Sequence, residues 1–302
     1  MASATDAGRL LITGASGFLG WHLCRQARAG WAVYALWRHH PVTVPGVITV
    51  QGDLTNAGFM ESLLREIRPQ AVIHAAAQSS NGFCESHAHD SLQINVLATE
   101  RLAGLCRRLT IPFVFTSTDM VFDGTRPPYA ENDPAAPLSA YGRQKADAEQ
   151  RVLHGHPRAL ICRLPLLIGL SGGHGSTFSL KIIEALDGGA PVSLFADEFR
   201  TPVDGESAAA GILMALGRGT GVLHLGGRTR ISRLQMGRRL AAIMGAGEDG
   251  IRPASLDDTA AGTRRPPDVA LDSRRAYARG YDPLDLDRAL ARLVRLHREG
   301  CS

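Results

Sequence analysis

The feature that most constrains the fold of this chain is a glycine-spaced turn close to its N-terminus. The stretch LLITGASGFLGWHL places Gly14, Gly17 and Gly20 between an apolar run and an amphipathic segment. Glycines at this spacing permit a tight turn, a close approach of backbone to a pyrophosphate, and close packing of a helix on a strand. The N–H groups at the start of a helix also attract phosphate. We therefore expect a strand, a turn and a helix that bind a dinucleotide, with a purely structural turn as the alternative.

Beyond this turn, short apolar runs alternate with longer amphipathic stretches. This alternation predicts βαβ units, so the expected fold is α/β, a Rossmann-type doubly wound parallel sheet with a smaller C-terminal substrate-binding lobe. The expected strands are 9–14, 32–36, 47–51, 71–76, 112–117 and 159–164. The expected helices are 18–29, 57–68, 85–108 and 139–153.

The second half of the chain is less regular. Residues 1–165 are expected to form the dinucleotide-binding Rossmann domain, and residues 166–302 mainly the substrate-binding lobe. Segments 169–176 and 262–269 are rich in glycine or proline and predict loops. Two later segments still predict strands, so the chain is expected to return to the main sheet between parts of the lobe; these segments are 192–196 and 221–227.

Composition excludes several classes of protein. Five scattered cysteines without a C-x-x-C pair predict neither a disulfide framework nor a zinc site, and they fit a reducing cytoplasm. The N-terminal sequence lacks a signal segment, and no apolar run is long enough to span a membrane, so we expect neither export nor a membrane anchor. The arginines are dispersed, which favours solvated helix faces over a nucleic-acid surface. His87 and His89 would diverge on a helix, and no metal is expected.

The residues after the second and third expected strands bear on the choice of dinucleotide. An Asp or Glu after the second strand binds the ribose 2′-hydroxyl of NAD, whereas an arginine suits the 2′-phosphate of NADP. This chain has Arg38, His39 and His40 there, which favours NADP and leaves NAD and a solvated loop as alternatives. Asp53 follows the third strand, where it would meet the adenine or cap the next helix.

The stretch YGRQK sets Tyr141 and Lys145 one helical turn apart, and Lys145 is one of only two lysines in the chain. A tyrosine hydroxyl is a weak acid at neutral pH unless a nearby cation favours the phenolate, and Lys145 would supply that charge. Thr118 ends the fifth expected strand, at the edge where ligands meet open α/β sheets. We expect Thr118 to orient a substrate carbonyl by hydrogen bonding. A tyrosine and a lysine on a wet helix face are the alternative.

Several motifs together resemble the extended short-chain dehydrogenase/reductase superfamily over nearly the full chain. They are T-G-x-x-G-F-L-G, the H-A-A-A of residues 74–77, S-T-D-x-V-F-D-G and Y-x-x-x-K. Within the superfamily the chain is most similar to the dTDP-4-dehydrorhamnose reductase-like branch, through STDMVFDGTRPPYAENDPAAPLSAYGRQK, Cys84-Glu85, FRTPV (199–203) and RPPDVALD (265–272).

The resemblance implies a nicotinamide-dependent carbonyl reductase. In it Tyr141 is the general acid, Lys145 lowers the pKa of Tyr141 and holds the nicotinamide ribose, and Thr118 positions the carbonyl. The implied cofactor contacts are Gly14, Ser16, Gly17, Phe18, Leu19, Gly20, Arg38, Asp53, Leu54, Ala75, Ala76, Ala77, Asn95, Tyr141, Lys145 and Leu164. For Asn95, a buried side chain that only bridges backbone groups is the alternative. The implied substrate contacts are Gln78, Asp119, Met120, Arg200 and Arg265.

The expected reaction is the NADPH-dependent reduction of a ketone, at C4 of a nucleotide-activated deoxysugar. Sugar-nucleotide 4,6-dehydratases have a glutamate where this chain has Met120, so dehydration is disfavoured. Two alternatives stay open: an epimerase that keeps NAD tightly bound, and a non-catalytic NADP-binding subunit similar to the regulatory subunit of methionine adenosyltransferase. By resemblance the chain would also form a homodimer through the helices 85–108 and 139–153, unless their apolar faces are wholly internal.

Overall fold

The computed structural model describes residues 7–172, 175–258 and 264–300. Small parts of the two predicted loops, at 173–174 and 262–263, lie outside the described residues, and so do Cys301 and the first six residues. Among the helices that are described, none has the length and apolar character needed to cross a membrane.

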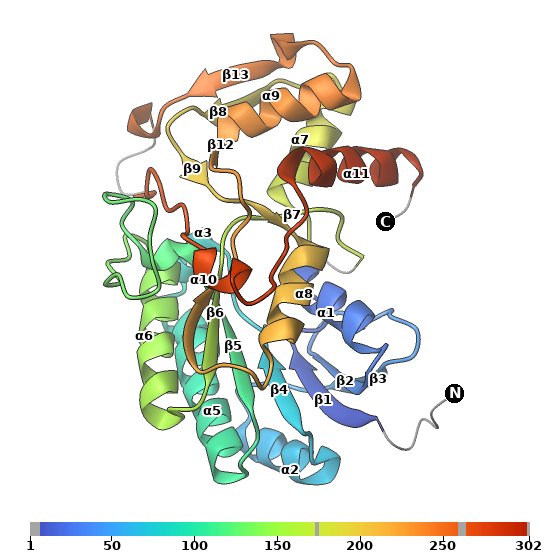
Figure 1. The fold of residues 1–302 in the computed structure, drawn as a ribbon, viewed down its shortest axis with the longest axis vertical. Coiled ribbons are helices and arrows are strands. Elements are labelled where there is room, and N and C mark those ends of the chain that lie inside the picture. Colours follow the sequence, from blue (N-terminus) through green and yellow to red (C-terminus); the bar gives the residue numbers. More distant parts are fainter. Residues whose placement is uncertain (1–6, 173–174, 259–263, 301–302) are drawn as a thin grey trace.

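A seven-stranded parallel sheet forms the larger part of the molecule (Figure 1). Its strand order is β11-β6-β5-β4-β1-β2-β3. The chain therefore adds strands on one side of β1 up to β3, and on the other side of β1 from β4 onwards. The strands are β1 (Gly8–Thr13), β2 (Trp31–Trp37), β3 (Ile48–Gln51), β4 (Ala71–His74), β5 (Phe113–Thr118), β6 (Leu160–Leu164) and β11 (Gly221–His224). Because every neighbouring pair is parallel, all carboxyl ends lie at one edge, where ligands bind to open α/β sheets. The predicted doubly wound α/β fold is confirmed.

Helices cover both faces of this sheet because successive side chains of a strand point to opposite sides. Leu10 and Ile12 of β1 belong to one core cluster, and Leu11 between them belongs to the other. The first cluster is covered by α1 (Phe18–Ala27) and α8 (Gly205–Ala215). The second is covered by α2 (Ala57–Ile67), α5 (Ala98–Arg108) and α6 (Ala140–Gly155).

The prediction of one continuous helix over residues 85–108 was wrong. The structure divides this part of the chain into α3 (Asn81–Ser86), α4 (Ala88–Leu92), the π-helical segment η1 (Gln93–Leu97) and α5. The first break falls at His87, whose φ of −126° and ψ of 56° are not helical. The apolar spacing that predicted a helix does not reveal such a break, because the helical segments before and after it both pack against α6.

A smaller region with its own apolar core lies beyond the carboxyl edge of the sheet (Figure 1). Its helices are α7 (Phe178–Asp187), α9 (Arg233–Met244), α11 (Leu286–Arg298) and the short η3 (Glu248–Gly250) and η4 (Leu256–Asp258). Its strands pair as β8 (Val192–Phe195) with β13 (Ile251–Ala254), and β9 (Phe199–Arg200) with β12 (Ile231–Ser232). Between this region and the sheet lie β7 (Leu167–Ile168), β10 (Val203–Asp204), η2 (Asp119–Val121) and α10 (Arg274–Tyr277).

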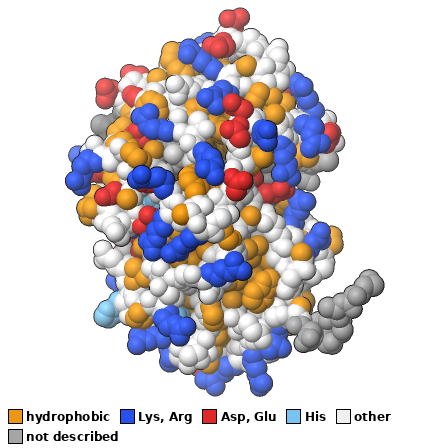
Figure 2. Space-filling model, viewed as in Figure 1, with side chains coloured by type: hydrophobic (Ala, Val, Ile, Leu, Met, Phe, Trp, Pro, Cys, Tyr) orange, Lys and Arg blue, Asp and Glu red, His pale blue; other side chains and the backbone are white. Residues whose placement is uncertain are grey.

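The two late segments predicted as strands behave differently. Residues 221–227 contain β11, which extends the main sheet beside β6. Residues 192–196 contain β8, which pairs with β13 in the smaller region and does not join the main sheet. On the face drawn in Figure 2, lysine and arginine side chains are dispersed and, in its upper half, interleaved with acidic ones.

Candidate active site

The glycine turn has the geometry that its spacing predicts. Gly14 has a φ of +67°, and a Cβ atom there would lie 2.6 Å from backbone atoms of Ala76. A Cβ atom on Gly20 would lie 2.1 Å from the Gly14 carbonyl oxygen, so the start of α1 packs directly on the turn. Both positions therefore require glycine, the first for its backbone conformation as well as for space.

The start of α1 has no side-chain cap. Gly17 is the N-cap residue and no side chain caps it, whereas Asn56 caps α2 and Ser139 caps α6. The first N–H groups of a helix have no partner within the helix, and they need side chains, water or a ligand. An uncapped N-terminus beside a glycine turn is suited to a phosphate group.

A pocket of about 330 Å³ opens at this turn and continues past the ends of β2, β3 and β4. It brings together ten of the predicted ligand contacts, namely Gly14, Ser16, Gly17, Arg38, Asp53, Leu54, Ala75, Ala76, Ala77 and Gln78. Seven predicted cofactor contacts do not line it: Phe18, Leu19, Gly20, Asn95, Tyr141, Lys145 and Leu164. Gly20 acts in packing, and Leu164 is buried at the end of β6. Trp37, Thr55 and Ile94 line the pocket without having been predicted. The residues present fit a dinucleotide.

Arg38 and Asp53 form an ion pair at the rim of this pocket, with 3.0 Å between Nη2 and Oδ2. Burial alone would raise the pKa of Asp53, but hydrogen bonds from Thr55 and the charge of Arg38 outweigh burial and hold the pKa below its usual value. The alternative that Asp53 caps the next helix is wrong, because Asn56 caps α2 by accepting from the Phe59 amide. Arg38 is 48% exposed and free to exchange its partner for a ligand anion.

Thr118, Tyr141 and Lys145 lie on adjacent elements at the carboxyl edge of the sheet. Thr118 is the buried last residue of β5, and its hydroxyl accepts from the Met120 amide and donates to Asp119 Oδ1, both at 3.2 Å. The first turns of α6 carry Tyr141 and Lys145. Packing of α6 on the residues after β5 is so close that a Cβ atom at Gly142 would lie 2.3 Å from the Met120 carbonyl oxygen.

Lys145 is almost completely buried, with 2% of its surface exposed. Its Nζ donates to the Thr116 carbonyl oxygen at 2.6 Å and lies 3.9 Å from the centre of the Phe115 ring. Burial lowers the pKa of Lys145 to about 7, although the charge of Glu149 one turn further along α6 partly offsets this effect. The ammonium group is thus held by the sheet as well as by its own helix.

The expected lowering of the Tyr141 pKa by Lys145 is not found in this structure. Burial raises the pKa of Tyr141 well above its usual value, and the charges of Asp119 and Cys84 raise it further. The Lys145 ammonium is directed at the Thr116 carbonyl oxygen instead. A phenol that stays protonated at neutral pH can act as an acid, and it becomes a base only when a cation comes closer.

Asn95 connects the pocket to α6. Its Oδ1 accepts from the Gln78 amide at 2.8 Å, and its Nδ2 donates to the Gln78 carbonyl oxygen at 3.0 Å and to Gln144 Oε1 at 2.8 Å. These bonds match the bridging alternative, and a contact of Asn95 with the cofactor stays a prediction. Asn95 lies in the π-helical segment, a local departure that is frequent at functional sites. Sequence analysis missed Gln144, for which no spacing gives a signal.

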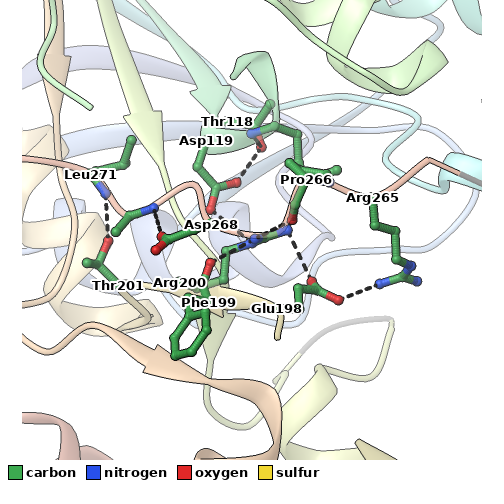
Figure 3. A network of polar contacts seen from close by, with 12 residues as sticks. Thr118, Asp119, Glu198, Phe199, Arg200, Thr201, Arg265, Pro266, Asp268 and Leu271 are labelled. Carbon is green, nitrogen blue, oxygen red and sulfur yellow. Dashed lines mark hydrogen bonds and ion pairs between the residues drawn. The ribbon is translucent and has the colours of Figure 1, made fainter. Parts of the chain in front are cut away.

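Asp119 and Arg200 belong to a buried network of charges between β5 and the smaller region (Figure 3). Arg200 is 3% exposed and lies 3.4 Å from Asp119 Oδ2 and 3.1 Å from Glu198 Oε1. It also donates to the Phe199 carbonyl oxygen at 2.8 Å and to Met120 Sδ at 3.4 Å. Arg200 was predicted to bind substrate, and it would have to exchange these partners to do so.

Glu198 is the centre of this network. Arg233 of α9 and Arg265 approach its carboxylate at 2.9 Å and 3.0 Å, in addition to Arg200. Arg265 is 39% exposed, so of the two predicted substrate arginines it is the one that reaches the surface. Glu198 and Arg233 were missed by sequence analysis, although Glu198 directly precedes the FRTPV segment.

Burial raises the pKa of Asp119 to about 6, although the charges of Arg200 and Arg233 act against it. Asp119 Oδ2 lies within ion-pair distance of Arg200, at 3.4 Å from Nε, but the two groups do not form a hydrogen bond. Thr118, whose hydroxyl donates to Oδ1, is therefore held by a carboxyl group whose own position depends on an arginine from β9.

Comparison with known proteins agrees with this fold. The family model "RmlD substrate binding domain" matches residues 8–298. The chain is 31% identical over 266 residues to a probable low-salt glycan biosynthesis reductase of Haloferax volcanii, covering 86% of this chain and 88% of that protein. It is 31% identical over 262 residues to a dTDP-4-keto-6-deoxy-D-glucose reductase of Streptomyces niveus, covering 85% and 86%.

Among solved structures, the fold is similar to that of a dTDP-4-dehydrorhamnose reductase of Bacillus anthracis in complex with NADP. The TM-score is 0.84 at 23% identity, covering 95% of this chain and 98% of that one. Fold, glycine turn and relatives together define an oxidoreductase of the extended short-chain dehydrogenase/reductase class. Within that class, the chain belongs to the RmlD substrate binding domain family.

Proposed function

We propose that this protein uses NADPH to reduce a ketone, the 4-keto group of a nucleotide-activated deoxysugar. The relatives that cover most of the chain are named as reductases, and one of them is a dTDP-4-keto-6-deoxy-D-glucose reductase. Arg38, His39 and His40 at the pocket rim favour NADPH over NADH, because they offer positive or hydrogen-bonding groups to a 2′-phosphate.

The observation that carries the proposal is the meeting of Thr118, Tyr141 and Lys145 at one edge of the sheet. The glycine turn follows β1 and Thr118 ends β5, so both lie at the carboxyl edge of the same parallel sheet. Asn95 connects the pocket residue Gln78 to the helix that carries Tyr141. These connections support proton transfer beside the pocket that fits a dinucleotide, although Thr118, Tyr141 and Lys145 do not themselves line that pocket.

Each of the three residues has a proposed role. NADPH, when bound, supplies a hydride to the carbonyl carbon, and the remaining step is the delivery of one proton to the carbonyl oxygen. Tyr141 keeps its proton at neutral pH and donates it there, while the Thr118 hydroxyl hydrogen-bonds the same oxygen. Lys145 would bind the cofactor ribose, and it would have to leave the Thr116 carbonyl oxygen to bring its charge close to Tyr141 and ease loss of the phenolic proton.

Elimination of water from the sugar is not part of this proposal. The position that follows Ser117, Thr118 and Asp119 carries Met120, whose sulfur lies 3.4 Å from Arg200 Nη2. A thioether neither donates nor accepts a proton at neutral pH, so this site lacks a second acid–base group of the glutamate type. The carbonyl reduction requires only the one proton from Tyr141.

The test is to mix the purified protein with NADPH and a 4-keto-6-deoxy sugar nucleotide and to follow absorbance at the reduced-nicotinamide band. Oxidation of one NADPH for each alcohol formed supports the proposal. Conversion of the sugar without net cofactor oxidation would identify an epimerase. Cofactor binding without turnover of any such ketone would identify a non-catalytic subunit, and both outcomes contradict the reductase.

A homodimer and a cytoplasmic location are further parts of the proposal. For the homodimer the support is resemblance, through residues 85–108, which run from the end of α3 to α5, and residues 139–153 of α6. Light scattering of the purified protein distinguishes a dimer from a monomer directly.

A further inference from the structure

A second cavity, of about 240 Å³, lies beside α1. It is lined by the middle of α1 (residues 21–25), the segment from the end of β7, the start of α8, and α11. None of its lining residues lines the pocket at the glycine turn, so the two are separate sites. The proposed reduction of a ketone gives this cavity no role.

Two polar side chains of this cavity lack hydrogen-bond partners in the described part of the chain. His22 is only 7% exposed, and neither of its ring nitrogens has a partner at full hydrogen-bond geometry, although the Leu170 backbone lies close enough to act on its pKa. Asp204 uses Oδ1 to cap α8, accepting from the Glu206 and Ser207 amides at 3.0 Å, while Oδ2 is buried without a partner. Buried polar atoms are nearly always paired, so this carboxylate oxygen and this imidazole are available to a polar ligand in the cavity.

The imidazole of His22 is neutral at physiological pH. Burial lowers the pKa of His22, and the Glu206 carboxylate and the Leu170 carbonyl only partly offset burial. A neutral imidazole carries one donor and one acceptor nitrogen, so it can bind a partner of either kind.

The other residues that line the cavity are apolar, or carry charges that are balanced by opposite charges in the same wall. Trp21 lies edge-on to His22, with 4.9 Å between ring centres, and Arg25 lies 4.5 Å from the centre of the Trp21 ring. Glu206 is held by Arg292 through two contacts of 2.6 Å and 2.7 Å. The rest of the apolar wall comes mainly from Leu170, Leu284, Leu293 and Leu296. The two arginines and two carboxylates of the wall cancel, so nothing here selects a strongly charged ligand.

We propose that this cavity binds a neutral, planar molecule of one or two fused rings that carries a hydrogen-bond donor. The donor meets Asp204 Oδ2, a ring heteroatom or hydroxyl meets His22, and the flat apolar body lies against Trp21 and the leucines of α11. Small pockets of this kind combine an apolar lining with a few convergent polar groups.

The test uses benzimidazole, which has one N–H donor and one ring nitrogen acceptor, and indene, which has the same shape and neither group. Each is titrated into the full-length protein by calorimetry with saturating NADPH present, so that the pocket at the glycine turn is not available to the probe. We expect saturable binding of benzimidazole. Replacing Leu296 by a larger ring in Leu296→Trp should abolish this binding by filling the cavity.

Two variants separate a ligand site from a structural role. His22→Phe should weaken benzimidazole binding by about tenfold, the effect of losing one hydrogen bond to a buried group, and should leave indene binding unchanged. Since it removes two unpaired nitrogens, it should not lower the melting temperature. Asp204→Asn keeps an oxygen that can cap α8, but an amide group takes the place of the unpaired Oδ2 and donates instead of accepting. This variant should weaken benzimidazole binding by a similar factor.

The proposal is overturned if benzimidazole does not bind saturably, or if both variants bind it as tightly as the parent protein. A His22→Phe protein that melts well below the parent would also contradict it, because His22 would then be a structural residue. If His22→Phe does not fold, that result likewise assigns His22 to the core, and Asp204→Asn decides whether a ligand is bound.

Discussion

Lys145 has the most restrictive environment of the proposed catalytic residues. A buried ammonium loses its hydration, which the carbonyl of Thr116 and the ring of Phe115 replace only in part. The pKa of Lys145 is therefore lowered to about 7 from 10.5. Retention of such a group at a cost in stability is typical of a functional site.

This lowered pKa predicts a specific pH dependence of stability. Below pH 7 the lysine is protonated in both folded and unfolded chains, and between about 7 and 10.5 only the unfolded chain keeps the proton. The contribution of Lys145 therefore makes the free energy of unfolding rise with pH through this window, by up to about 1.4 kcal/mol per pH unit. Lys145→Met should be more stable than the parent protein near pH 7 and should lose this rise.

Urea unfolding at several pH values measures the effect. The chain offers a matched control in Lys181, its only other lysine, which is exposed. Lys181→Met should keep the pH dependence of the parent protein. An unchanged pH dependence in Lys145→Met would show that the ammonium is not held in the environment described here.

The Arg38–Asp53 pair predicts how cofactor preference can be changed. Arg38→Gln removes the positive charge that would meet a 2′-phosphate, so NADPH affinity should fall by about tenfold or more while NADH affinity changes little. Asp53→Asn frees Arg38 from its ion pair, so its selectivity for NADPH should rise. Fluorescence titration with both cofactors measures these ratios. Equal losses for NADPH and NADH in Arg38→Gln would contradict a role at the 2′-phosphate.

Helix α6 is fixed to the sheet by a second buried charge. Glu149 lies one turn after Lys145 and accepts three hydrogen bonds from Arg163 of β6, at 3.0, 3.2 and 2.6 Å. Both side chains are buried, and Arg163 Nη1 also lies 3.3 Å from His224 Nε2 on β11. The pair thus connects α6 with two strands of the sheet and positions the helix that carries Tyr141 and Lys145.

Breaking this pair from one side should be costly. Arg163→Met leaves the Glu149 carboxylate buried without a counter-charge, and we expect a loss of about 3–5 kcal/mol in the free energy of unfolding. Arg151→Met is the control, since Arg151 pairs with Asp147 and Glu100 at the surface, and it should cost less than about 1 kcal/mol. Chemical denaturation compares the two variants. Similar small losses in both would mean that Glu149 is not a buried anion.

The regular elements of the N-terminal half could be predicted because their spacing follows from sheet burial and helix amphipathicity. The break at His87 and the π-helical segment at 93–97 could not, because they depend on how Asn95 reaches Gln78 and Gln144 after the chain has folded. The local sequence contains Asn95, but it does not show that Asn95 lies within hydrogen-bond distance of Gln78 and Gln144 in the folded chain.

Charges from distant parts of the sequence join the smaller region to the catalytic edge of the sheet. Glu198 lies between Arg200, Arg233 and Arg265, and Arg200 in turn holds Asp119 at the end of β5. This network could not be predicted from the sequence, because its members are up to 146 residues apart and no motif spacing connects Asp119 with Arg265. The glycine turn and the Tyr141–Lys145 pair could be predicted, because each lies within one short segment.

Removal of the central carboxylate should affect the whole smaller region. Glu198→Gln leaves three arginines with one negative partner fewer, so we expect β9, β12 and the start of α9 to lose protection in hydrogen exchange, while β1 and β2 keep theirs. Glu248→Gln, which breaks an exposed pair with Arg238, is the control. Uniform loss of protection across the main sheet would show that the network does not act locally between the two regions.

In the proposed reaction Tyr141 delivers the proton to a ketone that NADPH reduces. The most direct measurement is the single-turnover rate of NADPH oxidation by Tyr141→Phe and by the parent protein, with a 4-keto-6-deoxy sugar nucleotide and with NADPH affinity measured in parallel. We expect a rate at least about 100-fold lower in Tyr141→Phe with nearly unchanged NADPH affinity. A Tyr141→Phe protein that turns over at the parent rate would contradict it.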